Sequence, residues 1–209
     1  MIPRVAYASC YVYSPTGTDE ICERSRLLRA LLKEGDARFM SRYAVRVHQQ
    51  AEQSAKLAGF FRATDVLVPV PRSTPRPSGG VWVAANLAHA LVHEGLGTEA
   101  WPGLRRISAV RKSATAEAGR RPTVARHYES FLMEQPSAPP QSLVLIDDVI
   151  TKGRTLLAAA ARAREAFPDA QIRAFALLRT MGLVSGIEHV LDPCKGEIRW
   201  QAGDAQRIP

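Results

Sequence analysis

The chain has 209 residues and a formal net charge of +8 at pH 7, from 28 Lys and Arg against 20 Asp and Glu. Hydrophobic residues make up 46% and charged residues 23%, which suits one folded domain and excludes a mainly disordered chain. The basic excess favours an anionic partner, and charge alone leaves nucleic acid, a membrane surface and a phosphorylated small molecule open.

The cysteine pattern bears on metal binding and on the redox compartment. Cys10, Cys22 and Cys194 form no Cys-x-x-Cys pair, so a zinc ribbon has no support. An odd number of cysteines without a secretory signal argues against a disulfide framework. No apolar run reaches the length that a membrane span needs. We therefore expect a reducing, cytoplasmic compartment and no membrane partner.

Hydrophobic spacing predicts helices and buried strands in alternation along the chain. The expected helices cover residues 18–33, 36–58, 82–95 and 154–167, and the expected strands cover 65–70, 142–149 and 172–178. Alternation of this kind predicts an α/β fold, a Rossmann-like core with a mainly parallel β-sheet flanked by helices.

The segments outside this pattern are assigned as loops and a tail. Residues 105–126 lack apolar periodicity and are expected to form a long loop, and the Pro- and Ser-rich stretch 133–142 a connector. The tail is expected to form a hairpin that turns at 192–196. We predict one domain, 1–209, with an N-terminal helical segment (1–62), a core (63–180) and the tail (181–209).

The segment 143–155, LVLIDDVITKGRT, carries the clearest chemical signal. A buried strand ends in Asp147 and Asp148, and a short Thr/Gly loop leads into a helix. Ligands of open α/β sheets bind outside the carboxyl ends of strands, and N–H groups at a helix start favour phosphate. Carboxylates beside a phosphate repel it unless they bind hydroxyls or a cation, so the pattern favours a sugar phosphate. The alternative is that the two aspartates cap a helix or form an Asx turn.

This segment resembles the 13-residue signature of the type I phosphoribosyltransferases, which is four apolar residues, two acidic, two apolar, then Thr-x-Gly-x-Thr. The resemblance implies that it binds the ribose 5-phosphate part of phosphoribosyl pyrophosphate (PRPP). It implies that Asp147 and Asp148 act in catalysis by contacting the ribose hydroxyls. It implies Mg²⁺ as cofactor, held through PRPP and by water on the acidic pair, with no direct side-chain ligand. The PRPP-binding loop residues would be Ile150, Thr151, Lys152, Gly153, Arg154 and Thr155.

A second candidate segment is Val68-Pro69-Val70-Pro71-Arg72-Ser73, again at the end of a strand. The resemblance implies that this loop binds pyrophosphate, with an unusual peptide bond exposing backbone N–H groups. Arg72 and Ser73 hold the matching positions, and Arg76, close by, is equally well explained as a solvated turn residue. The Pro-Val-Pro run also resembles the ComF branch, linked to competence and DNA uptake, whose N-terminal zinc ribbon this chain lacks.

The loop 105–126 is a third candidate because a flexible loop closes over the site in the family that the chain resembles. Arg111 and Lys112, together with Arg121, would then neutralise the departing pyrophosphate as catalytic cations. The alternative is a basic loop that stays in solvent.

The resemblance implies a Mg²⁺-dependent phosphoribosyltransferase that joins the 5-phosphoribosyl group of PRPP to a nitrogen nucleophile, a base or ammonia, and releases pyrophosphate. Two alternatives stay open, a non-catalytic regulator that senses PRPP or nucleotides and a ComF-like accessory protein in DNA uptake. The expected partners are PRPP and a nitrogenous acceptor. Nucleic acid has no supporting motif, and a homodimer is compatible with the sequence.

Overall fold

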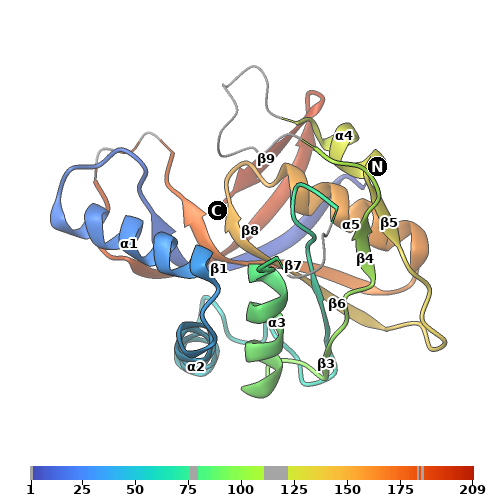
Figure 1. Ribbon diagram of the computed structural model, residues 1–209, viewed down its shortest axis with the longest axis horizontal. Coiled ribbons are helices and arrows are strands. Elements are labelled where there is room, and N and C mark those ends of the chain that lie inside the picture. Colours follow the sequence, from blue (N-terminus) through green and yellow to red (C-terminus); the bar gives the residue numbers. More distant parts are fainter. Residues whose placement is uncertain (1, 76–79, 111–121, 183, 185) are drawn as a thin grey trace.

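The computed structural model describes residues 2–75, 80–110, 122–182, 184 and 186–209, and its fold is α/β with helices on both faces of a central sheet (Figure 1). The helices are α1 (Glu20–Glu34), α2 (Ala37–Gln53), α3 (Val83–His93), α4 (Val124–Glu129) and α5 (Arg154–Ala166). The strands are β1 (Arg4–Tyr13), β2 (Val66–Pro69), β3 (Glu99–Ala100), β4 (Leu104–Arg106), β5 (Phe131–Met133), β6 (Ser142–Ile150), β7 (Gln171–Thr180), β8 (Leu191–Gln201) and β9 (Asp204–Ile208).

The central sheet has the strand order β3-β2-β6-β7-β1-β8-β9. The five strands from β3 to β1 run parallel, and β8 and β9 extend the sheet antiparallel to them. A separate antiparallel ladder joins β4 to β5. The expected α/β fold with a mainly parallel sheet flanked by helices is therefore confirmed, and the sheet is compatible with a Rossmann-like core.

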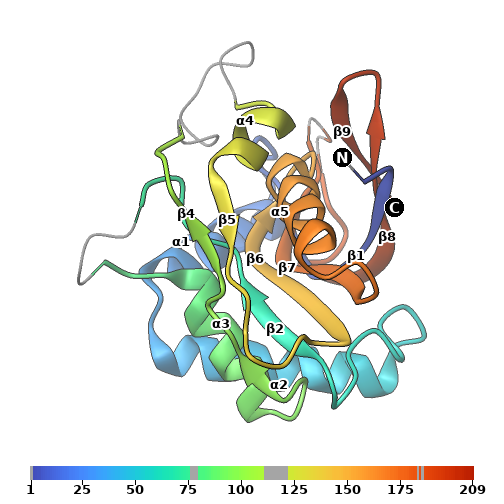
Figure 2. The same ribbon diagram turned by 90° about the vertical axis from the view of Figure 1, so that its right-hand side faces the viewer.

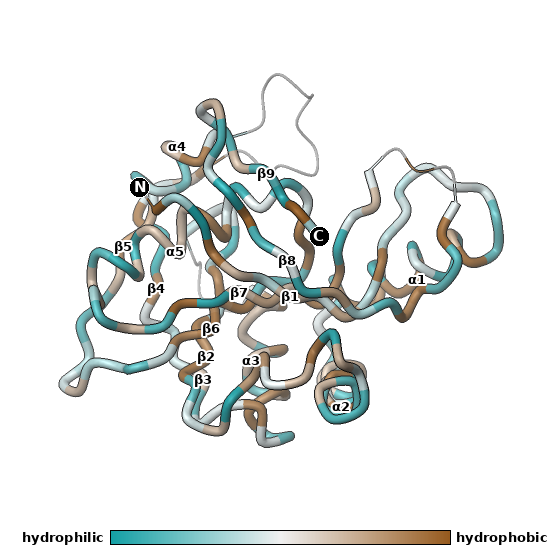
Figure 3. The backbone as a smooth tube through the Cα atoms, turned by 180° about the vertical axis from the view of Figure 1, so that it is seen from behind, coloured by the Kyte–Doolittle hydropathy of each residue, from teal (hydrophilic) through white to brown (hydrophobic). Residues whose placement is uncertain are grey.

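The sheet separates two hydrophobic cores, because neighbouring residues of a strand point to opposite faces. In β6, Leu143 and Leu145 pack towards α5, whereas Val144 and Ile146 pack towards α2 and α3. Figure 2 shows α5 on one side of the sheet and α2 and α3 on the other, and Figure 3 shows hydrophobic residues along β2, β6 and α3. Burial of each such side chain contributes about 1.5–3 kcal/mol, which explains why the apolar runs specify the strands.

The connections place a topological switch point at the carboxyl ends of β2 and β6. From β2 the chain passes through α3 to β3 on one side, and from β6 it passes through α5 to β7 on the other side. The direction of the connections therefore reverses between β2 and β6, and the two connecting helices, α3 and α5, cover opposite faces of the sheet. Ligands of open α/β sheets bind at such a switch point.

Three segments differ from the sequence-based expectation. The N-terminal segment is not helical throughout, because β1 pairs with β7 and β8 inside the sheet. The expected loop 105–126 begins within β4 and ends within α4. The tail forms a hairpin, but the expected turn at 192–196 is wrong: these residues lie within β8, and the turn is at Ala202–Gly203. Pro193 lies instead within β8, beside an irregularity in the pairing with β1, where a missing N–H is tolerated.

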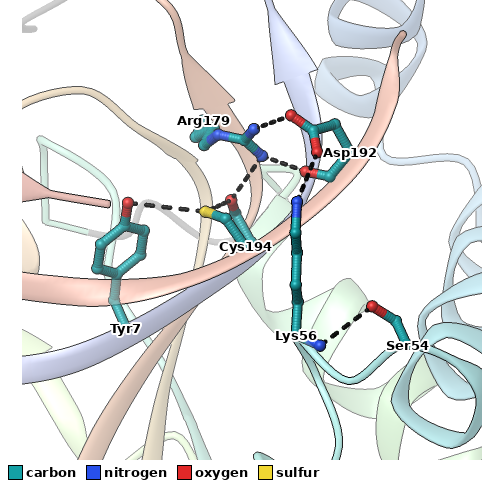
Figure 4. A network of polar contacts seen from close by, with 7 residues as sticks. Tyr7, Ser54, Lys56, Arg179, Asp192 and Cys194 are labelled. Atoms are coloured by element: carbon teal, nitrogen blue, oxygen red, sulfur yellow. Dashed lines mark hydrogen bonds and ion pairs between the residues drawn. The ribbon is translucent and has the colours of Figure 1, made fainter.

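A polar network ties the antiparallel strands to the parallel part of the sheet (Figure 4). Arg179 of β7 forms an ion pair with Asp192 of β8 and reaches the hydroxyl of Ser9 in the intervening strand β1. The thiol of Cys194 lies 3.7 Å from the hydroxyl of Tyr7. Burial is the main cause that raises the pKa of Tyr7, so this phenol stays neutral.

All three cysteines are free and buried. Within the described ranges, no helix combines the length and the apolar character that crossing a bilayer requires.

Candidate functional site

The acidic pair at the end of β6 contacts elements on both sides of the sheet. Asp148 forms an ion pair with Lys33, in the last turn of α1, and its other carboxylate oxygen accepts the Val149 N–H at 2.8 Å. Asp147 accepts the Asp148 N–H at 2.9 Å, and its charge interacts with Arg106 of β4. The two carboxylates interact with each other although they belong to adjacent residues of a strand, with Lys33 paired to Asp148 and the charge of Arg106 acting on Asp147.

The electrostatics of the pair favour a hydroxyl donor or a cation as ligand. Burial raises the pKa of Asp147 well above its usual value, and the neighbouring charge of Asp148 adds to the rise. Lys33 opposes it. A ligand hydroxyl that donates to this pair would stabilise the charged form of Asp147, and a bound cation would do the same.

The loop after the pair bends at Gly153, which precedes the first turn of α5. Gly153 has φ 88°, in the left-handed region, and a Cβ atom there would lie 2.6 Å from Cγ2 of Ile198 in β8. A side chain is thus excluded on both conformational and steric grounds. The carbonyl of Gly153 accepts the Leu157 N–H at 2.9 Å, and no side chain caps the helix. The alternative in which the aspartates cap a helix is therefore wrong.

The residues expected to bind the 5-phosphate differ in their surroundings. Ile150 is buried, and Thr151 and Lys152 are exposed. The hydroxyl of Thr155 lies 3.5 Å from Nε2 of His127. Arg154 and Lys152 both form ion pairs with Asp204 at the start of β9, so their charges face the C-terminal hairpin.

The loop after β2 adjoins the end of β6. The Val70 N–H donates to the Ile146 carbonyl at 2.8 Å. The side chain of Arg72 donates from Nη1 to the Val81 carbonyl at 3.1 Å, and the backbone carbonyl of Ser73 accepts the Val110 N–H at 2.8 Å. Arg72 and Ser73 therefore follow the strand next to the acidic pair, as expected.

The expected unusual peptide bond is not found in the part of the chain that the structure describes, where every peptide bond is trans. Arg111 and Lys112, expected to act in catalysis, lie outside the described residues, as do Arg76 and Arg121.

A buried arginine, Arg106, connects the loop after β2 to the turn between α4 and β5, and the sequence did not identify it. Arg106 is 7% exposed, donates from Nε to the Arg72 carbonyl and from Nη1 to the Ser130 hydroxyl, and stacks over the Phe131 ring at 4.2 Å. Burial lowers its pKa to about 10, and Asp147 opposes that shift. A buried cation needs hydrogen bonds or an ion pair, and Arg106 has the two hydrogen bonds. Its positive charge acts on Asp147 and so contributes positive potential next to the acidic pair.

His127 lies beside Arg106 and is buried without a hydrogen-bond partner for Nδ1. Burial, together with the positive charges of Arg106 and Arg154, lowers the pKa of His127 to about 4. The ring is therefore neutral at pH 7. The sequence carries no signal for Arg106, because Leu104 is followed by two arginines and only the packing of β4 buries the second of them.

The acidic pair offers the kind of oxygen donors that Mg²⁺ requires. Mg²⁺ in proteins takes oxygen ligands and keeps several waters, with one or two carboxylates plus substrate phosphates. Asp147 and Asp148 offer such oxygens, and across the described residues no group of three or more His, Cys, Asp or Glu side chains could hold a metal ion. The pair therefore fits a hydrated Mg²⁺ that a ligand brings with it.

Two cavities lie near the carboxyl ends of the strands. One, of about 280 Å³, is lined by residues in and beside β2, β3 and α3, among them Pro69, Trp82 and Asn86. The other, of about 580 Å³, lies between α1 and residues 188–191 and is lined in part by Tyr11 and Leu28.

No family model matches the chain, and no curated protein sequence matches it. The fold and the geometry of the site are therefore the basis for assigning a function.

Proposed function

We propose that the chain is a Mg²⁺-dependent phosphoribosyltransferase of type I, which transfers the 5-phosphoribosyl group of PRPP to a nitrogen nucleophile. One observation carries the proposal. The acidic pair of β6 and the Thr/Gly loop at the start of α5 form one continuous segment, 147–155, at the switch point of a mainly parallel sheet. Carboxylates followed by a helix start suit a ligand that has hydroxyls at one end and phosphate at the other.

In this proposal the 5-phosphate contacts the N–H groups and threonine hydroxyls of the loop 151–155. The ribose hydroxyls donate to Asp147 and Asp148. The raised pKa of Asp147 supports this role, because a donated hydrogen bond favours its charged form. Lys33 would share Asp148 with the ribose, since one carboxylate can accept several hydrogen bonds.

Pyrophosphate would lie towards the loop after β2, next to Arg72 and Ser73. In the reaction, the bond between the anomeric carbon and a pyrophosphate oxygen breaks, and its electron pair leaves with pyrophosphate. The nitrogen nucleophile forms the new bond and releases its proton to solvent. Mg²⁺, brought by the substrate and oriented through water by Asp147 and Asp148, would supply charge neutralisation of the leaving group. Arg106 adds positive potential on the protein side.

Calorimetric titration with PRPP and Mg²⁺, followed by assays of pyrophosphate release with a panel of bases and ammonia, tests the proposal. The double variant Asp147→Asn/Asp148→Asn should bind PRPP at least about tenfold more weakly, since it loses two charge-assisted contacts. Asp169→Asn, which alters an exposed carboxylate beyond the far end of α5, is the matched control. Unchanged PRPP binding by the double variant would refute the assigned contacts.

A second candidate function is that of a PRPP-sensing regulator that binds nucleic acid, and an arginine stripe on α2 favours it. Arg38, Arg42 and Arg46 are exposed at four-residue spacing, and none forms an ion pair within the described part of the chain. The opposite face of α2 is buried in the core and cannot insert into a bilayer.

The two functions differ in what the arginine stripe does. If the chain is a regulator that binds nucleic acid, replacing the three arginines by Gln should weaken oligonucleotide binding and reduce its dependence on salt. Arg4→Gln, on another exposed surface, should have a smaller effect. Nucleic-acid binding that responds to PRPP, without pyrophosphate release, would favour the regulator over the enzyme.

A further inference from the structure

The C-terminal hairpin, β8–β9, binds both cations of the loop through one carboxylate. Asp204 accepts from Nε of Arg154 at 2.5 Å and from Nη2 at 2.6 Å, and from Nζ of Lys152 at 3.3 Å. It also accepts the N–H of Ala205 at 2.8 Å. The bond from Arg154 is the main cause that lowers the pKa of Asp204 to about 2. A two-pronged contact of this kind fixes the orientation of both partners.

The same hairpin touches the loop at two further points. Ile198 of β8 packs directly against Gly153, where no Cβ atom fits. Arg207 of β9 donates to the Ile150 carbonyl at 3.3 Å and to the Thr180 carbonyl at 2.6 Å. The beginning, middle and end of the loop 150–154 therefore all rest on a segment that follows it in the sequence by more than 40 residues.

These contacts change the part that the loop cations can play. Arg154, in the first turn of α5, is committed to the hairpin, and its side chain is only 22% exposed. A phosphate on the hairpin side would meet the negative charge of Asp204. With both loop cations held by Asp204, the groups of the loop left to bind a phosphate are its backbone N–H groups and threonine hydroxyls.

We propose that Asp204 is a positioning residue that holds the candidate phosphate loop in its binding conformation by fixing Arg154 and Lys152. The inference rests on the proposed function for the identity of the ligand, a ribose 5-phosphate. It assigns the C-terminal hairpin an indirect role in binding, exerted through the loop.

Hydrogen–deuterium exchange of the ligand-free protein tests the positioning without any ligand. In Asp204→Asn, which keeps an acceptor for the Ala205 N–H, the amides of residues 150–156 should exchange about tenfold faster than in the wild type. Glu197→Gln is the matched control, because it removes a carboxylate of the same hairpin whose partners are Arg4 and Arg199. Unchanged exchange of the loop in Asp204→Asn overturns the inference.

Binding of ribose 5-phosphate and of Mg²⁺-pyrophosphate then separates positioning from general destabilisation. Asp204→Asn should bind ribose 5-phosphate about tenfold more weakly and bind pyrophosphate as the wild type does. Arg154→Gln should weaken ribose 5-phosphate binding to the same extent, and combining the two changes should add little. Tighter binding by Asp204→Asn would mean that the carboxylate competes with phosphate, which overturns the inference. If the wild type binds no ribose 5-phosphate, the proposed function is refuted. Hydrogen–deuterium exchange of the loop still tests, in that case, whether Asp204 positions it.

Discussion

Replacing Gly153 by alanine tests how tightly the candidate phosphate loop packs on the hairpin. The added Cβ would meet two penalties. A left-handed conformation costs a residue other than glycine about 1–2 kcal/mol. Overlap with Cγ2 of Ile198, 2.6 Å from the ideal Cβ position, forces a shift in a packed core that costs about 1–3 kcal/mol. We expect Gly153→Ala to lower the free energy of unfolding by about 2–5 kcal/mol.

Gly95→Ala is the matched control for this change. Gly95 has a similar φ of 81°, but no atom lies within 4 Å of the Cβ position, so only the conformational penalty of about 1–2 kcal/mol applies. Urea denaturation of both variants measures the difference, and the double variant Gly153→Ala/Ile198→Ala should lose less than the sum of its parts. Equal losses for Gly153→Ala and Gly95→Ala would refute the contact with Ile198.

Two further predictions concern buried polar groups. Because the pKa of His127 is about 4 in the fold against 6.5 unfolded, the unfolded chain takes up a proton first as the pH falls, and stability should drop by up to about 3 kcal/mol between pH 6.5 and 4. Urea titrations across this range should show the drop in the wild type and not in His127→Gln; equal pH dependence would contradict it. Asp65→Asn should cost about 3–5 kcal/mol by leaving the Arg173 guanidinium buried without its carboxylate. A loss below about 1 kcal/mol, as expected for an exposed pair, would contradict that role.

The sequence predicted those elements whose apolar residues specify them directly. β2, β6 and β7 each contain a run of apolar residues, and the apolar spacing in α3 gives one buried face. In α5 the spacing predicted the helix, but the burial, which covers Leu156–Ala161 and Ala163, is wider than one face. β1 was missed because tyrosine, serine and cysteine interrupt its apolar pattern although most of it is buried. β4 and β5, with three residues each, are too short for periodicity to show.

The candidate site was predictable where it is contiguous in the sequence. The acidic pair and the loop 150–155 lie in one motif, and the loop after β2 follows a strand of its own. Lys33, Arg106 and Asp204 were not predictable, because each reaches the site from a distant segment; Lys33 is 115 residues from its partner Asp148. Their positions depend on how α1, β4 and the hairpin pack, which no local pattern specifies.

A crystal structure of the protein with ribose 5-phosphate and Mg²⁺ tests the central claim most directly. The account predicts the phosphate on the loop 151–155 and the ribose hydroxyls within hydrogen-bond distance of Asp147 and Asp148. A sugar phosphate bound elsewhere, for instance in the cavity between α1 and residues 188–191, with the loop unliganded, would contradict it.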